Sequence, residues 1–123
     1  MNILSDVDGY VLPLPTANLD AYRSMAEQAG KIWMEHGALA YKECLAEDMD
    51  VEWAKGSFPR SAGAGKDETV IFAFIIFKSR EHRDEVNAKV HADHRLSGCS
   101  DMQNMPFDLK RMIYGGFTTL VDL

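Results

Sequence analysis

The chain has 123 residues, 46% hydrophobic and 26% charged, which suits one globular domain with its own core. Its formal net charge is −6, and its Lys and Arg residues form no dense group, which argues against a nucleic-acid-binding protein. No apolar run approaches the roughly 20 residues that cross a bilayer.

Two further features concern the cellular compartment. The first residues lack the basic segment and the long apolar segment of a signal peptide. Cys44 and Cys99 lie far apart and match no metal or redox motif. We therefore expect a reduced, cytoplasmic protein with a single domain over residues 1–123.

The first predicted elements are a strand and a helix. Residues 6–14 alternate apolar side chains between two faces, and Pro13 and Pro15 are expected to end this strand because proline cannot donate to a sheet ladder. Asn18 is the predicted N-cap of the helix, and Gly37 follows its last turn. The apolar stripe of this helix recurs at three- and four-residue steps: Leu19, Tyr22, Ala26, Ala29 and Trp33.

A second strand is predicted at residues 38–47. This segment alternates again but is half polar, which favours a position near the edge of a sheet. Residues 51–53 could extend the strand past a bulge. Residues 57–66 are rich in Ser, Gly and Ala and are predicted to form a flexible loop.

Residues 69–77 form the longest apolar run and are predicted to be the central strand. β-branched and aromatic residues dominate it, and charged residues bound it on both sides. One face carries Thr69, Ile71, Ala73, Ile75 and Phe77, and the other carries Val70, Phe72, Phe74 and Ile76. Both faces are apolar, so the helices of the chain can cover one and something else must cover the second.

The last third of the chain predicts a helix, a loop and a strand. Ser79 caps the helix, whose inward stripe begins with His82 and continues through Val86 and Val90, while Arg83 and Asn87 are expected to face solvent. Residues 95–109 are predicted to be a long loop with at most one helical turn. Residues 111–121 predict a strand in which Gly115 and Gly116 suggest a bulge or a close backbone approach.

The order β-α-β-β-α-β predicts an α+β protein of the ferredoxin-like type, with both helices on one face of a four-stranded antiparallel sheet. The second apolar face of the central strand would then be exposed in a monomer, and such patches mark interfaces. Two sheets packed face to face across a two-fold axis would cover it, so we expect a homodimer.

Four blocks of the sequence carry a resemblance to a known family. They are residues 8–15, 36–43, 79–90 and 106–117. In this order they resemble the uncharacterised bacterial family typified by YbaA, over nearly the whole chain. The resemblance implies a dimeric α+β barrel, a superfamily with cofactor-independent monooxygenases, haem-dependent enzymes and isomerases. It supplies no catalytic residue, because the family has no established activity, and the link to function is analogy of fold.

Three residues are candidates for catalysis. His82 lies on the inward stripe of the second helix and could be a base near neutral pH, or a buried histidine with a structural partner. Tyr41 and Glu43 share a strand face with Leu39, where a carboxylate could act as an acid or base. Glu43 could equally be an edge charge or a partner of Arg111 or Lys42.

Four further residues are candidates for ligand binding: Trp33, His36, Tyr114 and Arg111. Trp33, Trp53, Phe58 and Tyr114 could line an aromatic pocket, although aromatic residues at such positions are more often core. His36 could instead complement the dipole of the first helix. His91 and His94 are spaced like metal ligands, but no third ligand has a diagnostic spacing, so we expect neither a metal nor a cofactor.

The function expected from these features is the binding of a small apolar or aromatic molecule between sheet and helices. The protein could act on that molecule without a metal, in the manner of cofactor-independent monooxygenases, with His82 as the proton acceptor. The alternative is a non-catalytic dimeric module that interacts with a partner or sequesters a ligand. No nucleic-acid or membrane partner is expected.

Overall fold

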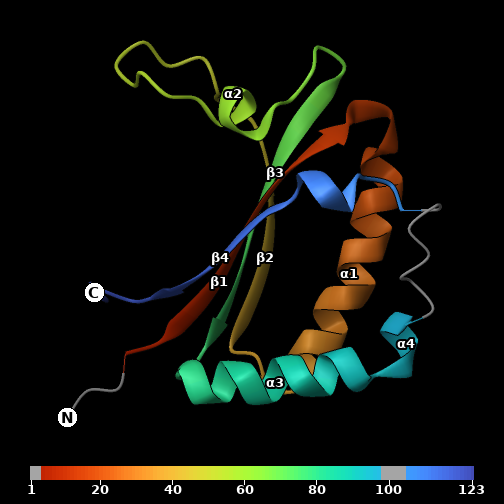
Figure 1. The fold of residues 1–123 in the computed structure, drawn as a ribbon, viewed down its shortest axis with the longest axis vertical. Helices are drawn as coiled ribbons and strands as arrows, with labels where there is room; N and C mark the ends of the chain where they lie inside the picture. The colour runs from red at the N-terminus through yellow and green to blue at the C-terminus, as the bar shows by residue number, and fades with distance from the viewer. Residues whose placement is uncertain (1–3, 98–104) are drawn as a thin grey trace.

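The computed structural model describes residues 4–97 and 105–123 and shows an α+β protein built on one antiparallel sheet (Figure 1). The strands are β1 (Asp6–Pro15), β2 (Ala40–Leu45), β3 (Glu68–Phe77) and β4 (Ile113–Thr118), in the spatial order β2-β3-β1-β4. The long helices are α1 (Leu19–Glu35) and α3 (Arg80–Ala92). The fold class and the four-stranded antiparallel sheet predicted from the sequence are confirmed.

Short helical elements complete the fold. They are η1 (Thr16–Asn18), α2 (Phe58–Ala62), α4 (His94–Ser97) and η2 (Leu109–Arg111). None of the helices in the described ranges combines the length and hydropathy that a membrane span requires.

One face of the sheet carries the core. Side chains of β1 and β3 that point to this face pack against α1 and α3, and Figure 1 shows α1 along the sheet and α3 across its lower end. The buried residues of this layer are Leu12, Leu14, Ile71, Ala73, Ile75 and Phe77 from the strands and Tyr22, Ala26, Ile32, Val86 and Val90 from the helices. The central strand therefore buries the face that its alternation predicts.

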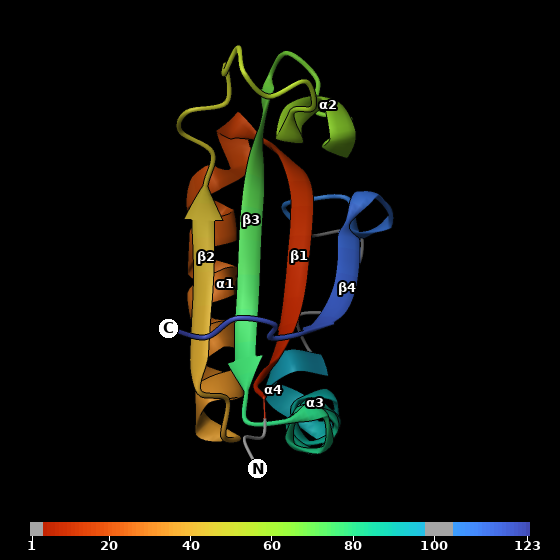
Figure 2. The ribbon, with the colours of Figure 1, turned by 90° about the vertical axis from the view of Figure 1, so that its left-hand side faces the viewer.

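The opposite face of the sheet, which we call the open face, is largely uncovered (Figure 2). Phe72 is 42% exposed and Phe117 is 61% exposed, although both are large apolar side chains. The short helix α2 covers only one end, where the Phe58 and Phe72 rings meet at 6.2 Å. The described strand residues that share this face include Val7, Val11, Phe72, Phe74, Ile76, Ile113 and Phe117.

Strand β1 continues through Pro13, contrary to the prediction that this proline ends it. Pro13 lies opposite Val70, while β4 pairs with β1 only from Asp6 to Val11. In an antiparallel sheet, the backbone N–H and C=O groups of successive residues point alternately to the neighbouring strand on one side and on the other. Thr16 donates its N–H to Asp67 O at 3.0 Å, so even-numbered positions bond to β3 and Pro13 faces the unpaired edge. The absence of an N–H group in Pro13 therefore removes no hydrogen bond between strands.

The segment between β2 and β3 also differs from its prediction. Residues 51–53 form no strand, and Trp53 is 87% exposed. The predicted loop contains α2, which the local sequence explains. The Ser57 hydroxyl accepts a hydrogen bond from Arg60 N at 3.2 Å, and Gly63 ends the helix with a φ of 69°.

The C-terminal strand is shorter than predicted, and its glycines cause no bulge. Gly115 and Gly116 pair in unbroken register with Gly9 and Asp8. The close approach suggested by the sequence is present, because a Cβ atom on Gly116 would overlap the guanidinium group of Arg83.

Candidate functional site

A cavity of about 200 Å³, here called the inner cavity, lies between α1 and the covered face of the sheet. Small residues leave this space open: Ala73 on β3 lines it together with Ala26 and Ala29 on α1. The larger described residues around it are mostly aromatic or sulfur-containing: Tyr10, Tyr22, Met25, Trp33, Tyr41, Met105, Phe107 and Met112. Such a lining suits an apolar ligand.

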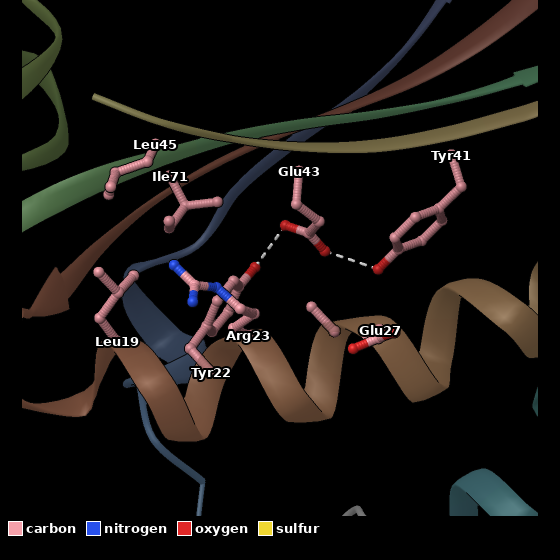
Figure 3. A pocket seen from close by; sticks show the side chains of 9 residues that line it. Leu19, Tyr22, Arg23, Glu27, Tyr41, Glu43, Leu45 and Ile71 are labelled. Atoms are coloured by element: carbon pink, nitrogen blue, oxygen red, sulfur yellow. Dashed lines mark hydrogen bonds between the residues drawn. The ribbon is translucent and has the colours of Figure 1, made fainter. Parts of the chain in front are cut away.

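A second depression of about 310 Å³, here called the outer hollow, lies between α1 and the edge strand β2. It shares Tyr22, Ala26, Tyr41 and Glu43 with the inner cavity. Figure 3 shows Glu43 pointing from β2 toward α1, between the two tyrosine rings. The carboxylate thus stands where the two spaces meet.

Two tyrosine hydroxyls hold the Glu43 carboxylate. Tyr22 donates to Oε1 at 2.7 Å, and Tyr41 donates to Oε2 at 2.6 Å. Burial, followed by the charge of Glu43, raises the pKa of both tyrosines above the ordinary value of 10. Both phenols therefore remain protonated at any physiological pH. Of the predicted catalytic residues, Tyr41 and Glu43 are brought together, and Tyr22 joins them from the helix.

Gly30 fixes the position of the Tyr41 ring. A Cβ atom built on Gly30 would lie 2.6 Å from Tyr41 Cδ1, so the bare glycine lets the ring pack directly on the backbone of α1. Trp33 also lies beside the Tyr41 ring, and the centroids of the two rings are 6.0 Å apart. A glycine that weakens a helix by itself is thus required by the packing.

We expect Gly30→Ala to destabilise the protein by about 1 to 3 kcal/mol, the usual effect of overpacking a filled site, despite the better helix propensity of alanine. Urea unfolding measures this change. Gly56→Ala is the control, because no atom lies within 4 Å of a Cβ atom there, and it should shift stability by less than about 0.5 kcal/mol. Equal effects of the two substitutions would contradict the packing role of Gly30.

His82, the third catalytic candidate, lies elsewhere. Its Nδ1 accepts a hydrogen bond from Lys78 N at 3.0 Å, and its ring meets Phe77 edge-on at 6.1 Å. His82 N donates to the Ser79 hydroxyl at 3.1 Å, which confirms Ser79 as the helix cap. His82 lines neither the inner cavity nor the outer hollow. Its contacts are those of a residue that secures the start of α3.

A buried polar network lies beside the cavity, and the sequence did not predict it. Asp8 is fully buried, and its carboxylate accepts from Asn87 Nδ2 at 3.0 Å and from Tyr114 OH at 3.0 Å. Asn87 Oδ1 in turn accepts from Trp33 Nε1 at 2.9 Å. Two ligand-binding candidates, Trp33 and Tyr114, thus meet this network, although only Trp33 also lines the inner cavity.

Arg83 completes this network, whereas the sequence placed Arg83 and Asn87 toward solvent. The Arg83 side chain is only 14% exposed, and Nη1 lies 3.2 Å from Asp6 Oδ2 and 3.5 Å from Asp8 Oδ1. The sequence did contain a signal for the buried position of Arg83, and it was on β1. Strand alternation puts Asp6 and Asp8 on the same face as Tyr10. Two carboxylates on a buried face require a cation.

The other two ligand-binding candidates contact carboxylates away from the cavity. His36 Nε2 lies 2.9 Å from Asp93 Oδ2, and the pKa of Asp93 is held well below its usual range, first by Arg95 and then by His36. Arg111 binds Glu68 through both of its terminal nitrogens, at 2.7 and 2.8 Å. The suggested pairing of Arg111 with Glu43 is therefore wrong.

The Arg111–Glu68 pair gives a pH dependence with a defined sign. Hydrogen bonds from Arg111 lower the pKa of Glu68 from 4.5 to about 2. The stabilisation is therefore complete above about pH 4.5 and is lost as the pH falls toward 2. We expect Glu68→Gln to be less stable than the wild type at pH 6 and equally stable near pH 2, as measured by thermal unfolding. A difference that stays constant over this range would exclude the pair as its cause.

The predicted absence of a metal stays a prediction. Across residues 4–97 and 105–123, no group of three or more His, Cys, Asp and Glu side chains could hold a metal ion. Asp93, which lies between His91 and His94, binds His36 and Arg95 instead. Cys99 lies outside the described residues.

The fold and site define a class of protein: a small α+β domain with one open sheet face and a ligand-sized cavity behind the sheet. The chain belongs to the family described as "Protein of unknown function (DUF1428)", whose model matches residues 5–109. It is 40% identical over 116 residues to "Uncharacterized protein YbaA" of Escherichia coli K12, an alignment that covers 94% of this chain and 97% of that protein. The YbaA protein of Shigella flexneri matches to the same extent. The predicted membership of the YbaA-like family is confirmed.

Proposed function

We propose that the protein binds a small, largely apolar molecule with an aromatic ring in the inner cavity. The observation that supports this proposal most is the combination of an open volume of about 200 Å³ with aromatic and methionine walls and one carboxylate. A cavity that is kept open beside a fixed polar group is the usual form of a small-molecule site.

The test uses Trp33 as a reporter of the cavity. Trp33 lines the cavity, while Trp53 is exposed and does not line it, so Trp53→Phe leaves one informative tryptophan. We expect 2-phenylethanol to change the Trp33 emission with a dissociation constant on the order of 0.1 to 1 mM, as its size allows. A flat titration up to about 10 mM would refute the proposal.

A matched pair of variants assigns the binding to this cavity. Ala29→Leu adds volume inside the cavity, whereas Ala21→Leu adds the same volume on the exposed side of the same helix. We expect Ala29→Leu to remove the binding of 2-phenylethanol and Ala21→Leu to retain it, with both proteins folded by circular dichroism. Equal binding by the two variants would place the ligand elsewhere.

The same geometry supports Glu43 as the group at which a reaction would begin. The hydroxyl groups of Tyr22 and Tyr41 both donate hydrogen bonds to Glu43. The Glu43 carboxylate is therefore the group at the cavity wall that would accept a proton. In a metal-free reaction of the cofactor-independent monooxygenase type, the bound molecule would transfer its proton to Glu43. Tyr41 would act as a positioning residue. His82 has no place in this proposal because it lines neither space.

A second candidate function, a homodimeric module, is supported by the open face. Exposed Phe72, Ile113 and Phe117 form a continuous apolar surface, which monomeric proteins rarely present. Of the described strand residues on this face, Lys42 on β2 and Glu68 at the start of β3 are charged, and Glu68 pairs with Arg111, so a second copy of the same face would meet little electrostatic repulsion. We propose that a second copy of the chain covers this surface.

Analytical ultracentrifugation tests the dimer. We expect the wild type to sediment at about twice its chain mass of 13.8 kDa at micromolar concentration and Phe72→Glu to sediment as a monomer. Trp53→Glu is the control, because it adds the same charge at an exposed apolar residue away from the sheet. A monomeric wild type would refute the dimer without affecting the ligand proposal.

A further inference from the structure

We infer that the ligand of the inner cavity is a cation, namely a small aromatic amine whose ammonium group binds the Glu43 carboxylate. This inference rests on the proposed function and adds the charge and hydrogen-bonding character of the ligand. It follows from the charge, the hydrogen bonding and the aromatic character of the residues that line the cavity.

The first argument is electrostatic. Glu43 is the one charged side chain among the described residues that line the inner cavity. Other shielded carboxylates of the described chain have cationic partners: Glu68 pairs with Arg111, and Asp6 and Asp8 with Arg83. Glu43 has the two tyrosine hydroxyls as hydrogen-bond partners, and Arg23, the cation that lines the outer hollow with it, forms no ion pair with it in the described structure. A negative charge at the wall of an apolar space is compensated best by a positive charge from the ligand.

The second argument is the direction of the hydrogen bonds. Tyr22 and Tyr41 each have one hydroxyl proton, and both protons are directed at Glu43. The indole N–H of Trp33 is directed at Asn87. The Tyr22 and Tyr41 oxygens and the Glu43 carboxylate therefore offer acceptors, which a ligand can use only by donating, while the Trp33 N–H is already engaged and the Tyr10 hydroxyl can donate or accept. An ammonium group donates three hydrogen bonds, whereas a carboxylate or phosphate donates none and would be repelled by Glu43.

The walls supply the third argument. Tyr10, Trp33 and Phe107 present aromatic rings to the cavity, and the negative faces of such rings attract cations. Met25, Met105 and Met112 give adaptable, polarisable packing for the apolar part of a ligand. A volume of about 200 Å³ is below the roughly 300 to 1,000 Å³ of sites for drug-sized ligands, so the ligand is a one-ring amine.

Three probes that share a phenylethyl group and differ in the charge of its terminal substituent test the inference on the Trp53→Phe protein at pH 7. They are 2-phenylethylamine, which is cationic, 2-phenylethanol, which is neutral, and 3-phenylpropanoate, which is anionic. We expect the amine to bind at least about 10-fold more tightly than the alcohol, equivalent to about 1.4 kcal/mol, and the anion to bind most weakly. Glu43→Gln should reduce the preference for the amine to within about 2-fold while the alcohol still binds. Glu47→Gln, an exposed change beyond the end of β2, should leave the preference intact.

The outcomes separate this inference from the function on which it rests. Equal binding of amine and alcohol, or preferred binding of the anion, would overturn the inference and leave small-molecule binding in place. Failure of all three probes to bind would overturn both. The ranking of the three probes on the protein with native Glu43 decides the question even if Glu43→Gln does not fold. Retention of the amine preference in a folded Glu43→Gln protein would also overturn the assignment to Glu43.

Discussion

Replacement of Arg83 by Met is expected to destabilise the protein by about 3 kcal/mol or more, a loss typical of removing one partner from a buried ion pair. The Arg83 guanidinium lies 3.2 Å from Asp6 and 3.5 Å from Asp8, and both aspartates are buried. Methionine retains the volume of the side chain but leaves two carboxylates without their cation. Asp8 has no exposed surface, so its carboxylate would remain without water, whereas Asp6 borders an open depression together with Arg83.

Urea unfolding of Arg83→Met measures this loss, and Arg80→Met is the matched control. Arg80 begins the same helix but is exposed, so its replacement should change stability by less than about 0.5 kcal/mol. Asp6 Oδ2 accepts no hydrogen bond within the described structure, which makes the charge of Arg83 its main compensation. Similar losses for the two arginines would show that the buried pairing is not what stabilises the junction of α3 and β1.

Replacement of Phe77 by Ala should destabilise the protein by about 3 to 5 kcal/mol, because it removes a large side chain from the core. Phe77 is completely buried between β3 and the helices, in a cluster with Ile75, Val86 and Val90. The cavity that remains cannot close without moving α3. This loss approaches half the stability of a small domain.

Phe72→Ala on the same strand is the comparison, because its side chain points to the open face and is 42% exposed. In the monomer this substitution should cost about 1 kcal/mol or less, mainly from contacts with Phe58 and Phe74. If the proposed dimer forms, the cost of Phe72→Ala rises with protein concentration, while that of Phe77→Ala does not. Equal costs at every concentration would contradict the difference between the two faces.

The architecture was largely predictable because it depends on periodicities within single elements. The two apolar faces of residues 69–77 identified the central strand, and Ser79 and Gly37 marked helix boundaries that the structure confirms. The errors came from local exceptions. Pro13 remains in β1 because β4 stops short of it, and α2 was missed although Ser57 and Gly63 carried capping signals.

The candidate site was predictable only in part. Strand alternation placed Tyr41 and Glu43 on one face, and they do lie together. Tyr22 was assigned only to the core, because no pattern within α1 shows that its hydroxyl meets a carboxylate on β2. Arg83 was assigned to solvent by its place on α3, although Asp6 and Asp8 on β1 required a cation.

The pattern of residues along the chain establishes which residues share a face, because side-chain direction repeats every two residues in a strand and every 3.6 in a helix. It thereby set the order of elements, the apolar open face and the pairing of Tyr41 with Glu43 on one side of β2. The tertiary structure decided which faces meet and at what distance. The inner cavity exists because Ala73 and the alanines of α1 lie opposite one another, and such a meeting of small side chains depends on packing between elements, which no local pattern specifies.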